Sequence, residues 1–463
     1  MVRGEEAGYR LLADVAGDLA PLLAPDQVKF FGNKVALTVD ALRAASGRIS
    51  VDRFDLAARS VTLSGTAQIA ADGLPDWFDV TGTLASPDET PVALPFVADT
   101  RISRADFHLK TVPGDAESWS GEVSVLRLDR PGLQIGQADL SGSGRIGRSS
   151  AGKSFGGTLT LMASGLAPTD PALATALGPQ IAGSVKLHML EGSGALQLSD
   201  IRLEGAGLTG SGALKVEGLD TGFLASGRLT VLAEDIGRFS GLAGRKLGGA
   251  GTVTVSGSAS RLSGFFDLDL AFDGQGLALD VPQLDRLLAG GSRLAASVRR
   301  DESGTVLRSL DLAARGLTGN ASGTLSSNGS NLSGTVTLDD LSALGSGYGG
   351  RLALEGSFTG LPEDGRLQLA GSGQSLRIGS PQVDKLLAGE SRLDLDLALK
   401  DGVLQVQSAR LGNPQLTASA RGEISGDTRR VDLEARLANL GLIVPELDGP
   451  LTLSGTAAQD NAG

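Results

Sequence analysis

One phrase occurs twice in this chain, as PQLDRLLAGGSRL at residues 282–294 and as PQVDKLLAGESRL at residues 381–393. The two starts lie 99 residues apart. Repetition at a fixed period is typical of proteins in which each unit buries its apolar face against its neighbours rather than alone. The sequence therefore predicts a tandem-repeat fold that is long and open-ended.

Two other short patterns, which we call landmarks, recur along the chain, and they keep a fixed order relative to this phrase. The first, Leu-Thr-Gly or a close variant, occurs at residues 63–65, 208–210, 317–319 and 416–418. The second, an Asp or Asn before an aliphatic residue, occurs at Asp235, Asp340 and Asn439. The preserved order indicates a genuine repeat. We place its units at residues 29–165 (with insertions), 166–278, 279–377 and 378–463 (truncated), after a lead-in at 1–28.

Between the landmarks, apolar and polar residues alternate. Residues 266–273 place Phe and Leu at every second position, with Asp or Ala between them. Residues 393–400 and 431–437 alternate in the same way, with Leu, Val or Ala at every second position and mostly charged residues between them. This period of two is that of a β-strand with one apolar face and one polar, solvent-facing side. Turn residues rich in Gly, Ser, Asn and Asp occur at 301–304, 328–329 and 400–402. Such turns are typical of hairpins, so the pattern predicts antiparallel meanders.

The repeated phrase itself predicts a short amphipathic helix, because the leucines of residues 284–288 are spaced i, i+3, i+4. In the second copy, Pro381 suits the first helical position, Ser380 is expected to cap the helix and Gly389 to end it. Residues 170–177 are predicted to form an earlier equivalent. Helix is expected to be the minor component of the fold.

The first 28 residues are interpreted as an amphipathic helical lead-in. Apolar residues in 11–23 have the spacing of one helix face, with breaks near Pro21 and Pro25. Together these patterns predict an all-β protein, an elongated tandem-repeat solenoid or open trough ("β-taco") of antiparallel strands. We expect it to have a hydrophobic interior and a few short amphipathic helices.

Composition narrows the class further. Gly accounts for 67 of 463 residues and aromatic residues for only 4%, so Leu, Val, Ile and Ala must line any apolar surface. The absence of Cys excludes disulfides and thiolate metal sites. The net charge is −12, and no Lys/Arg cluster or aromatic stacking platform appears, which argues against binding of nucleic acid.

No segment contains the ~18 consecutive apolar residues of a membrane span. Residues 1–28 also lack the uninterrupted apolar run of a signal peptide. Taken alone, these features describe a soluble cytoplasmic chain. The repeats, however, start and stop without an evident capping unit, so we expect this sequence to be a piece of a longer protein.

The search for catalytic chemistry identifies no site. His108 and His188 each lie in a strand-like stretch without another ligand or base at suitable spacing, and we interpret both as sheet-face residues. Gly142, Gly144 and Gly147 match a dinucleotide-binding pattern, but a chain this rich in Gly contains it by chance and lacks the strand-to-helix context. We therefore predict neither an enzyme nor a cofactor or metal site.

Other polar and aromatic features have structural interpretations. The alternating acids are expected on the solvated outer face, because the calcium-binding nonapeptide of β-rolls is absent. They are Asp267, Asp269, Asp394 and Asp396. Asn320 and Asn331 match the glycosylation sequon, but such residues are common in these turns. Trp77 and Trp119 are isolated and are expected to serve core or edge packing.

The rhythm and order of these phrases resemble the TamB family of the AsmA-like superfamily. Strands of the form Leu-x-Gly-x-Leu-x-Val and their punctuating segments carry the resemblance, at residues 208–216, 340–344, 439–442 and 451–455. The phrases at 239–244 and 381–387 are similar in particular to TamB proteins of alphaproteobacteria. The resemblance covers essentially the whole chain, and no single motif in it is diagnostic.

The resemblance implies an inner-membrane-anchored periplasmic protein whose strands curl into a long trough that bridges toward the outer membrane. Family members are linked to phospholipid transport between the membranes and to outer membrane biogenesis. With TamA, an outer-membrane partner of the Omp85 type, they are linked to the assembly of outer-membrane proteins such as autotransporters. Neither the family's membrane anchor nor its partner-docking segment is recognisable in these residues.

The residues themselves suggest a compatible function. At ~11 residues per strand, about 40 strands spaced ~4.8 Å apart would form a rod on the order of 150 to 200 Å long. Burying an acyl chain in a continuous apolar trough along this rod would be favourable by ~25 cal/mol per Å² of apolar surface. This free energy of burial would be nearly the same at every point of the path. The candidate lining residues of this lipid groove are Phe266, Leu268, Leu270, Phe272, Leu393, Leu395, Leu397, Leu399, Val431, Leu433 and Leu437.

Two other functions stay open at this stage. One is a scaffold for outer-membrane protein assembly that lends its sheet edge to partner strands. The other is a surface adhesin or a β-helix enzyme acting on polysaccharide, which would need a paired-carboxylate cleft or an aromatic sugar platform. Neither of those two features is visible in the sequence.

Overall fold

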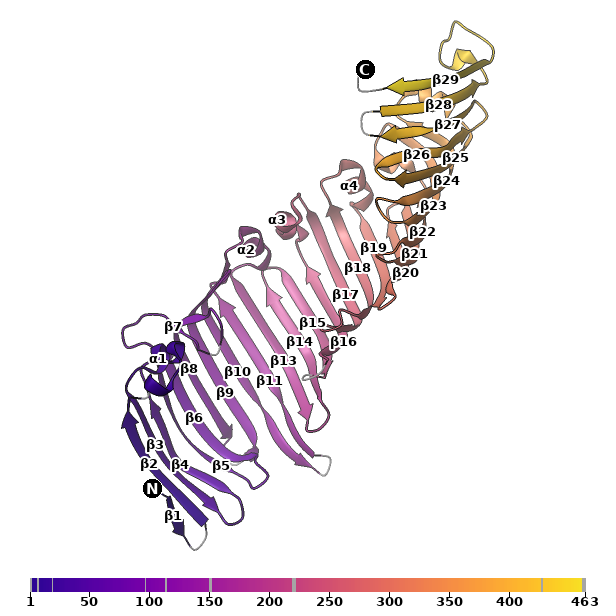
Figure 1. Cartoon of the computed structure of the whole chain (residues 1–463). Coiled ribbons are helices and arrows are strands. Elements are labelled where there is room, and N and C mark those ends of the chain that lie inside the picture. Colours follow the sequence, from indigo (N-terminus) through magenta and orange to yellow (C-terminus); the bar gives the residue numbers. More distant parts are fainter. Residues whose placement is uncertain are drawn as a thin grey trace. The chain divides into compact units, whose positions relative to one another are not determined.

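The computed structural model describes residues 2–5, 8–18, 20–95, 97–112, 115–149, 152–218, 222–425 and 428–459. The chain is all-β, and its strands form antiparallel pairs in open sheets that do not close into a barrel. It divides into two units, Met1–Phe223 and Leu224–Gly463. In each unit the long strands run side by side, and short helices stand along one edge (Figure 1). The predicted fold class is confirmed.

In the first unit each long strand pairs with the next one along the chain, while β7 pairs with β8 and β12 with β10. Its elements are β1 (Val2–Glu5), β2 (Gly8–Gly17), η1 (Ala20–Leu22), α1 (Pro25–Phe31), β3 (Val35–Ala44), β4 (Ile49–Ala57), β5 (Val61–Ile69), β6 (Pro75–Ala85), β7 (Val92–Ala93), β8 (Arg101–Val112), β9 (Asp115–Arg130), β10 (Leu133–Ser149), β11 (Gly152–Ser164), β12 (Ala167–Pro168), α2 (Pro171–Leu177), β13 (Gln180–Leu190), β14 (Ala195–Gly205) and β15 (Leu208–Glu217).

The second unit is a simple meander in which consecutive strands pair from β16 to β29. Its elements are β16 (Leu224–Ala233), η2 (Ile236–Phe239), α3 (Ser240–Ala243), β17 (Gly248–Ser260), β18 (Phe266–Ala278), α4 (Pro282–Leu288), β19 (Gly291–Asp301), β20 (Gly304–Ala314), β21 (Leu317–Leu325), β22 (Ser330–Leu338), η3 (Leu341–Leu344), β23 (Tyr348–Gly360), β24 (Gly365–Ile378), α5 (Pro381–Leu386), β25 (Glu390–Lys400), β26 (Val403–Gly412), β27 (Leu416–Ser425), β28 (Thr428–Leu437), η4 (Leu440–Leu442) and β29 (Leu451–Gln459).

Two sequence-based expectations are wrong. The described residues form 29 strands rather than about 40, because many strands are longer than expected and β10 reaches 17 residues. The expected helix in residues 11–23 is also absent. Leu11, Ala13 and Val15 lie on β2, which pairs with β3 over its whole length, and helix α1 begins only at Pro25. Apolar residues at this spacing fit a helix face as well as a strand, and pairing with β3 decides between them.

The recurring Asp or Asn landmark marks a capped 3₁₀ turn at the end of a strand. The side chain of Asp340 accepts a hydrogen bond from the Ser342 amide at 2.8 Å, and Asn439 accepts one from the Gly441 amide at 2.8 Å. Asp235 caps η2 in the same way. Because Asp and Asn readily satisfy the free amide two residues ahead, each landmark ends one strand and starts the turn to the next.

The repeated phrase forms α4 and α5 as predicted, and residues 171–177 form the expected equivalent, α2. Within the phrase, Asp285 accepts a hydrogen bond from the Leu279 amide at 2.6 Å, and Asp384 accepts one from the Ile378 amide at 2.7 Å. Each aspartate therefore ties its helix to the end of the preceding strand, which explains why both copies of the phrase contain it.

The expected boundaries of α5 need correction. Ser380 occupies the cap position, but its side chain makes no capping hydrogen bond. The helix ends at Leu386, before Gly389. Gly389 has a φ of +91° and leads directly into β25, so it forms the turn after the helix rather than its last residue.

Fully buried side chains gather where helices and turns pack on the sheet edge. In the first unit, Phe30 of α1 packs with Val92, Ile102 and Ala105 of β7 and β8. In the second unit, Leu287 of α4 is almost completely buried. Helices α1 and α4 therefore bury apolar side chains along one edge of each sheet and do not form a layer over the sheet faces.

The two copies of the phrase differ in one buried polar contact. The side-chain amide of Asn413 donates to the Leu386 carbonyl at 2.6 Å and to the hydroxyl of buried Ser391 at 3.3 Å. The residue 99 positions earlier is Ala314, which has no amide. The buried hydroxyl of Ser292, which corresponds to Ser391, has no hydrogen-bond partner among the described residues.

We expect Asn413→Ala to lower the free energy of unfolding of the second unit by about 1–3 kcal/mol, because it leaves buried polar groups unsatisfied. The reciprocal change Ala314→Asn should raise it by about 1 kcal/mol, since it supplies Ser292 with a partner. Urea unfolding followed by circular dichroism measures both changes. A destabilising Ala314→Asn would show that the contact does not transfer between repeats.

Candidate functional site: the apolar face

The register of the second unit places the predicted lining residues on one face. Directly opposed residues of antiparallel strands point to the same side of a sheet. Leu395 lies opposite Leu369 on β24 and Ala409 on β26, and Ala409 leads through Ala420 to Leu433 on β28. The same tracing puts all eleven candidates on this side, which we call the apolar face: Phe266, Leu268, Leu270, Phe272, Leu393, Leu395, Leu397, Leu399, Val431, Leu433 and Leu437.

One row of this face runs across the sheet from β18 to β28. It consists of Leu268, Val298, Leu307, Gly323, Leu332, Phe358, Leu367, Leu397, Val406, Gly422 and Val431. Only aliphatic residues, one Phe and two Gly occur in it. The register shifts in β20 and β26 are bulges that keep the apolar residues in step, so the row continues through them.

The opposite side of the second unit, which we call the polar face, carries hydroxyls and ion pairs. Thr230 and Thr254 form a hydroxyl contact at 3.0 Å, and Arg293 pairs with Asp273 at 2.9 Å. Arg366 forms two hydrogen bonds with Asp396 and so holds the pKa of that carboxyl below its ordinary value. Asp267, Asp269, Asp394 and Asp396 all lie on this side, as predicted.

The apolar face has no second layer over it in the described part of the chain. Leu367 and Leu433, both in its interior rows, are each 40% exposed. Apolar surface in these rows therefore stays in contact with water unless a ligand or partner covers it.

The first unit repeats this division into two faces. On its apolar side, Val123 of β9 lies opposite Phe107 of β8 and Leu140 of β10. Trp119, on the same side of β9, stacks on Phe155 with ring centroids 5.3 Å apart and is buried. The packing role expected for Trp119 is confirmed, whereas the side chain of Trp77 is exposed.

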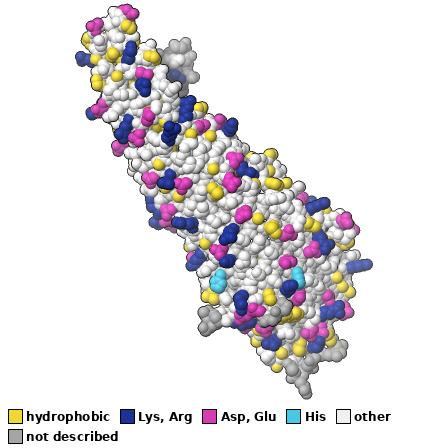
Figure 2. Space-filling model, turned by 180° about the vertical axis from the view of Figure 1, so that it is seen from behind, with side chains coloured by type: hydrophobic (Ala, Val, Ile, Leu, Met, Phe, Trp, Pro, Cys, Tyr) yellow, Lys and Arg dark blue, Asp and Glu magenta, His cyan; other side chains and the backbone are white. Residues whose placement is uncertain are grey.

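Both histidines lie on the polar face of the first unit. His108 is opposite Thr81 and its ring nitrogen lies 2.8 Å from Asp79, while His188 is opposite Gly156 and Gln197. Figure 2 shows this face, with both histidines in cyan among scattered charged groups. Their interpretation as sheet-face residues is confirmed. Within the described ranges, no group of three or more His, Asp or Glu is arranged to hold a metal ion.

Two hollows on the polar faces escaped the sequence analysis. One of about 550 Å³ in the first unit is lined by hydroxyls such as those of Thr38 and Thr81. The other, of about 680 Å³ in the second unit, is lined by Arg392, Arg410 and Arg436 with Asp394 and Glu434 among them. The arginines come from three different strands, so no local sequence signal marks them as neighbours. Only the strand register brings them together.

Among the helices that the structure describes, none has the length and apolar character needed to cross a bilayer. Comparison with protein-family models, with curated proteins and with solved structures finds no match to this chain. The resemblance to the TamB family therefore stays a prediction that rests on the sequence phrases.

Proposed function

We propose that this protein conducts phospholipid between the inner and outer membranes as a periplasmic hydrophobic-groove protein and so supports outer membrane biogenesis. The observation that carries the proposal is the continuous, uncovered apolar face, whose rows run from strand to strand. The TamB resemblance supports the compartment and the anchoring to the inner membrane. It also supports an outer-membrane partner of the Omp85 type, similar to TamA.

An acyl chain suits this face for physical reasons. Burying apolar surface is favourable by roughly 25 cal/mol per Å² and requires no specific orientation. Successive strands stand about 4.8 Å apart, so one acyl chain lying along a row touches several strands at once. Because the residues of a row are nearly all Leu, Val, Phe or Gly, the binding energy changes little as the chain moves from one strand to the next.

The proposed mechanism is passive. The apolar face holds the acyl chains, while the polar face, with its ion pairs, stays in water and limits adhesion to anionic membrane surfaces. No step requires a catalytic residue or a cofactor. Directional movement would come from the membranes and partners at either end of the path.

Native mass spectrometry with lipid extraction on the purified chain, expressed in a bacterium, tests the proposal. We expect phospholipid to co-purify with the folded protein. A lipid-free chain with full β circular dichroism would count against a lipid conduit. It would favour the alternative in which the sheet edge docks strands of outer-membrane proteins.

A further inference from the structure

The apolar face of the first unit is open in its middle and closed at one end. Leu140, in the middle of β10, is 38% exposed, and Leu109, two residues before Thr111 on β8, is 39% exposed. Nearer the tip of the β8–β9 hairpin, Thr111 and Trp119 lie opposite each other on the same face and are only 3% and 9% exposed. Something therefore covers the face at this end.

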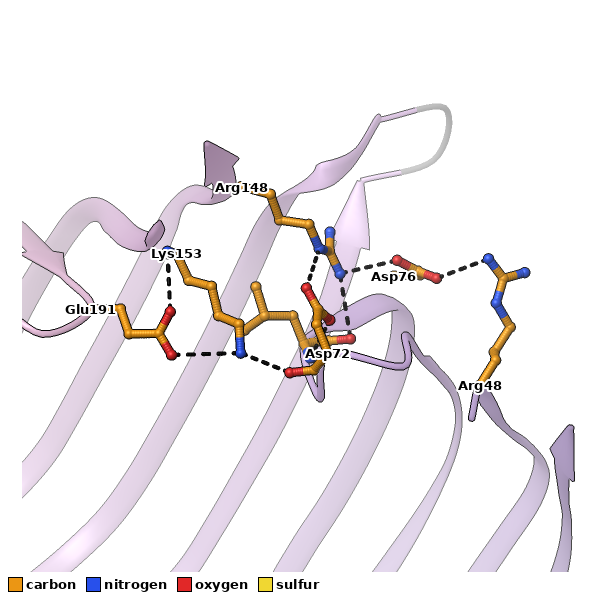
Figure 3. Close-up of polar contacts among 7 residues, drawn as sticks. Arg48, Asp72, Asp76, Arg148, Lys153 and Glu191 are labelled. Carbon is orange, nitrogen blue, oxygen red and sulfur yellow. Dashed lines mark hydrogen bonds and ion pairs between the residues drawn. The ribbon is translucent and has the colours of Figure 1, made fainter. Parts of the chain in front are cut away.

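A cluster of charged side chains lies at that end and joins two distant hairpins (Figure 3). Arg148, at the tip of β10, pairs with Asp72 at 3.0 Å and with Asp76 at 3.1 Å. The ammonium group of Lys153, at the start of β11, donates to the backbone carbonyl of Asp72 at 2.7 Å. Asp72 belongs to the turn between β5 and β6, so these contacts link residues 72 to 81 positions apart.

Two more ion pairs extend the cluster to neighbouring turns. Arg48, from the β3–β4 turn, pairs with Asp76 at 3.4 Å, and Glu191, after β13, pairs with Lys153 at 3.6 Å. We call the six residues the clasp: Arg48, Asp72, Asp76, Arg148, Lys153 and Glu191. It contains three positive and three negative groups, so its formal charges balance.

The clasp requires the sheet to curl. In the order of pairing, β8, β9 and β10 lie between β6 and β11. Four strand spacings correspond to about 19 Å in a flat sheet. That distance is far beyond the reach of Lys153, yet its ammonium group touches the carbonyl of Asp72. The tips of the two hairpins have therefore approached each other.

The curl is toward the apolar face. Arg148 and Lys153 are opposed to each other, two positions beyond the opposed pair Ile146 and Phe155. Because side chains alternate along a strand, Arg148 and Lys153 project on the same side as Ile146, Phe155 and the ring of Trp119. The clasp thus crosses the end of the apolar face and closes it.

We propose that the clasp is a reversible latch that closes the hairpin end of the apolar face and, when released, opens the row of Trp119 to ligands. Its side chains are between 26% and 56% exposed, so water and salt reach the ion pairs and weaken them. The Leu74 amide and Arg148 hold the pKa of Asp72 below its ordinary value, so this carboxylate stays ionised to a more acidic pH than an unpaired one. Only its role in lipid passage rests on the proposed function.

Trp119 serves as the probe of the latch, because its ring stacks on Phe155, two positions from Lys153 on β11. The chain has two tryptophans, so Trp77→Phe leaves Trp119 as the single tryptophan. In this background, Arg148→Glu combined with Lys153→Glu should shift the emission to longer wavelength and raise acrylamide quenching at least twofold. Adding Asp72→Lys and Asp76→Lys, which restores opposite charges across the clasp, should reverse part of that change.

Arg145→Glu is the matched control, because Arg145 lies on the same strand as Arg148 but faces the polar side, opposite Ser118, and pairs with Glu117 at 3.0 Å. It should leave the fluorescence of Trp119 unchanged. Raising NaCl from 0.05 to 1 M on the chain with intact clasp should increase quenching, which tests the latch even where a charge-reversed variant fails to fold.

Unchanged quenching in the charge-reversed variant, or no response to salt, would overturn the latch. A response of Trp119 supports it whether or not lipid co-purifies, so failure of the latch and failure of the lipid-conduit proposal are separate results. Where lipid does co-purify, the charge-reversed variant should retain a different amount from the control variant.

Discussion

Leu397→Asp is expected to reduce the phospholipid that co-purifies with the chain by tenfold or more. Leu397 lies in an interior row of the apolar face, opposite Leu367 on β24 and Val406 on β26. A carboxylate there must stay hydrated, because transferring an unpaired charge to an apolar environment is very unfavourable. An acyl chain lying along this row would have to leave that water in place or displace it at high cost. Combining this change with Leu433→Asp should remove the remaining lipid.

The matched control is Ala398→Asp, which introduces the same residue one position further along β25. Ala398 faces the polar side, opposite Arg366 and Gln405. The carboxylate of an aspartate at this position would therefore point to water beside the Arg366 cation. Lipid should be retained in this variant at the level of the original chain. Native mass spectrometry measures the lipid and circular dichroism checks the fold of both variants. Equal lipid in the two would contradict a path along the apolar face.

Gly323→Ala is expected to lower the free energy of unfolding by about 2–4 kcal/mol. Gly323 has a φ of +144°, and a Cβ at this position would overlap the backbone carbonyl of Asn331 on the neighbouring strand. The close approach recurs 99 residues later, where a Cβ on Gly422 would overlap the Arg430 carbonyl. Gly323 and Gly422, the two glycines in the row of Leu397, thus allow the backbones of adjacent strands to approach closely. A methyl group at residue 323 must push β21 and β22 apart.

Gly412→Ala is the control, since Gly412 has no positive φ and no atom within 4 Å of the added methyl group. It should be neutral or slightly stabilising, because alanine restricts the unfolded chain. Urea unfolding compares the two variants, and hydrogen exchange localises the loss to the amides of β21 and β22. Equal stability of the two variants would show that the close approach at Gly323 relaxes without cost.

Much of the fold was predictable from local sequence. The repeated phrase predicted α4 and α5. The recurring Asp or Asn marked the breaks between strands, and the structure shows these breaks as capped 3₁₀ turns. The alternation in residues 266–273 predicted a strand with one apolar side, which β18 has. These features are local, because one hydrogen bond or one pair of neighbouring residues decides each of them.

Prediction failed where tertiary pairing competes with local pattern. Residues 11–15 have apolar spacing that fits either a helix or a strand, and the ten residue pairs that β2 (Gly8–Gly17) forms with β3 make them part of a strand. Strand lengths also depend on partners, which is why the strand count was overestimated. The clasp left no signal in the sequence at all, because Asp72 and Arg148 approach only when the sheet between them curls.

The sequence by itself determined which residues share a face, because side chains alternate with a period of two and antiparallel register carries that alternation from strand to strand. All eleven predicted lining residues therefore lie on the apolar face. Only the tertiary structure decided where that face is open and where it is closed. Sheet curvature and contacts between distant turns set the covering of Trp119, and neither is encoded in the spacing of nearby residues.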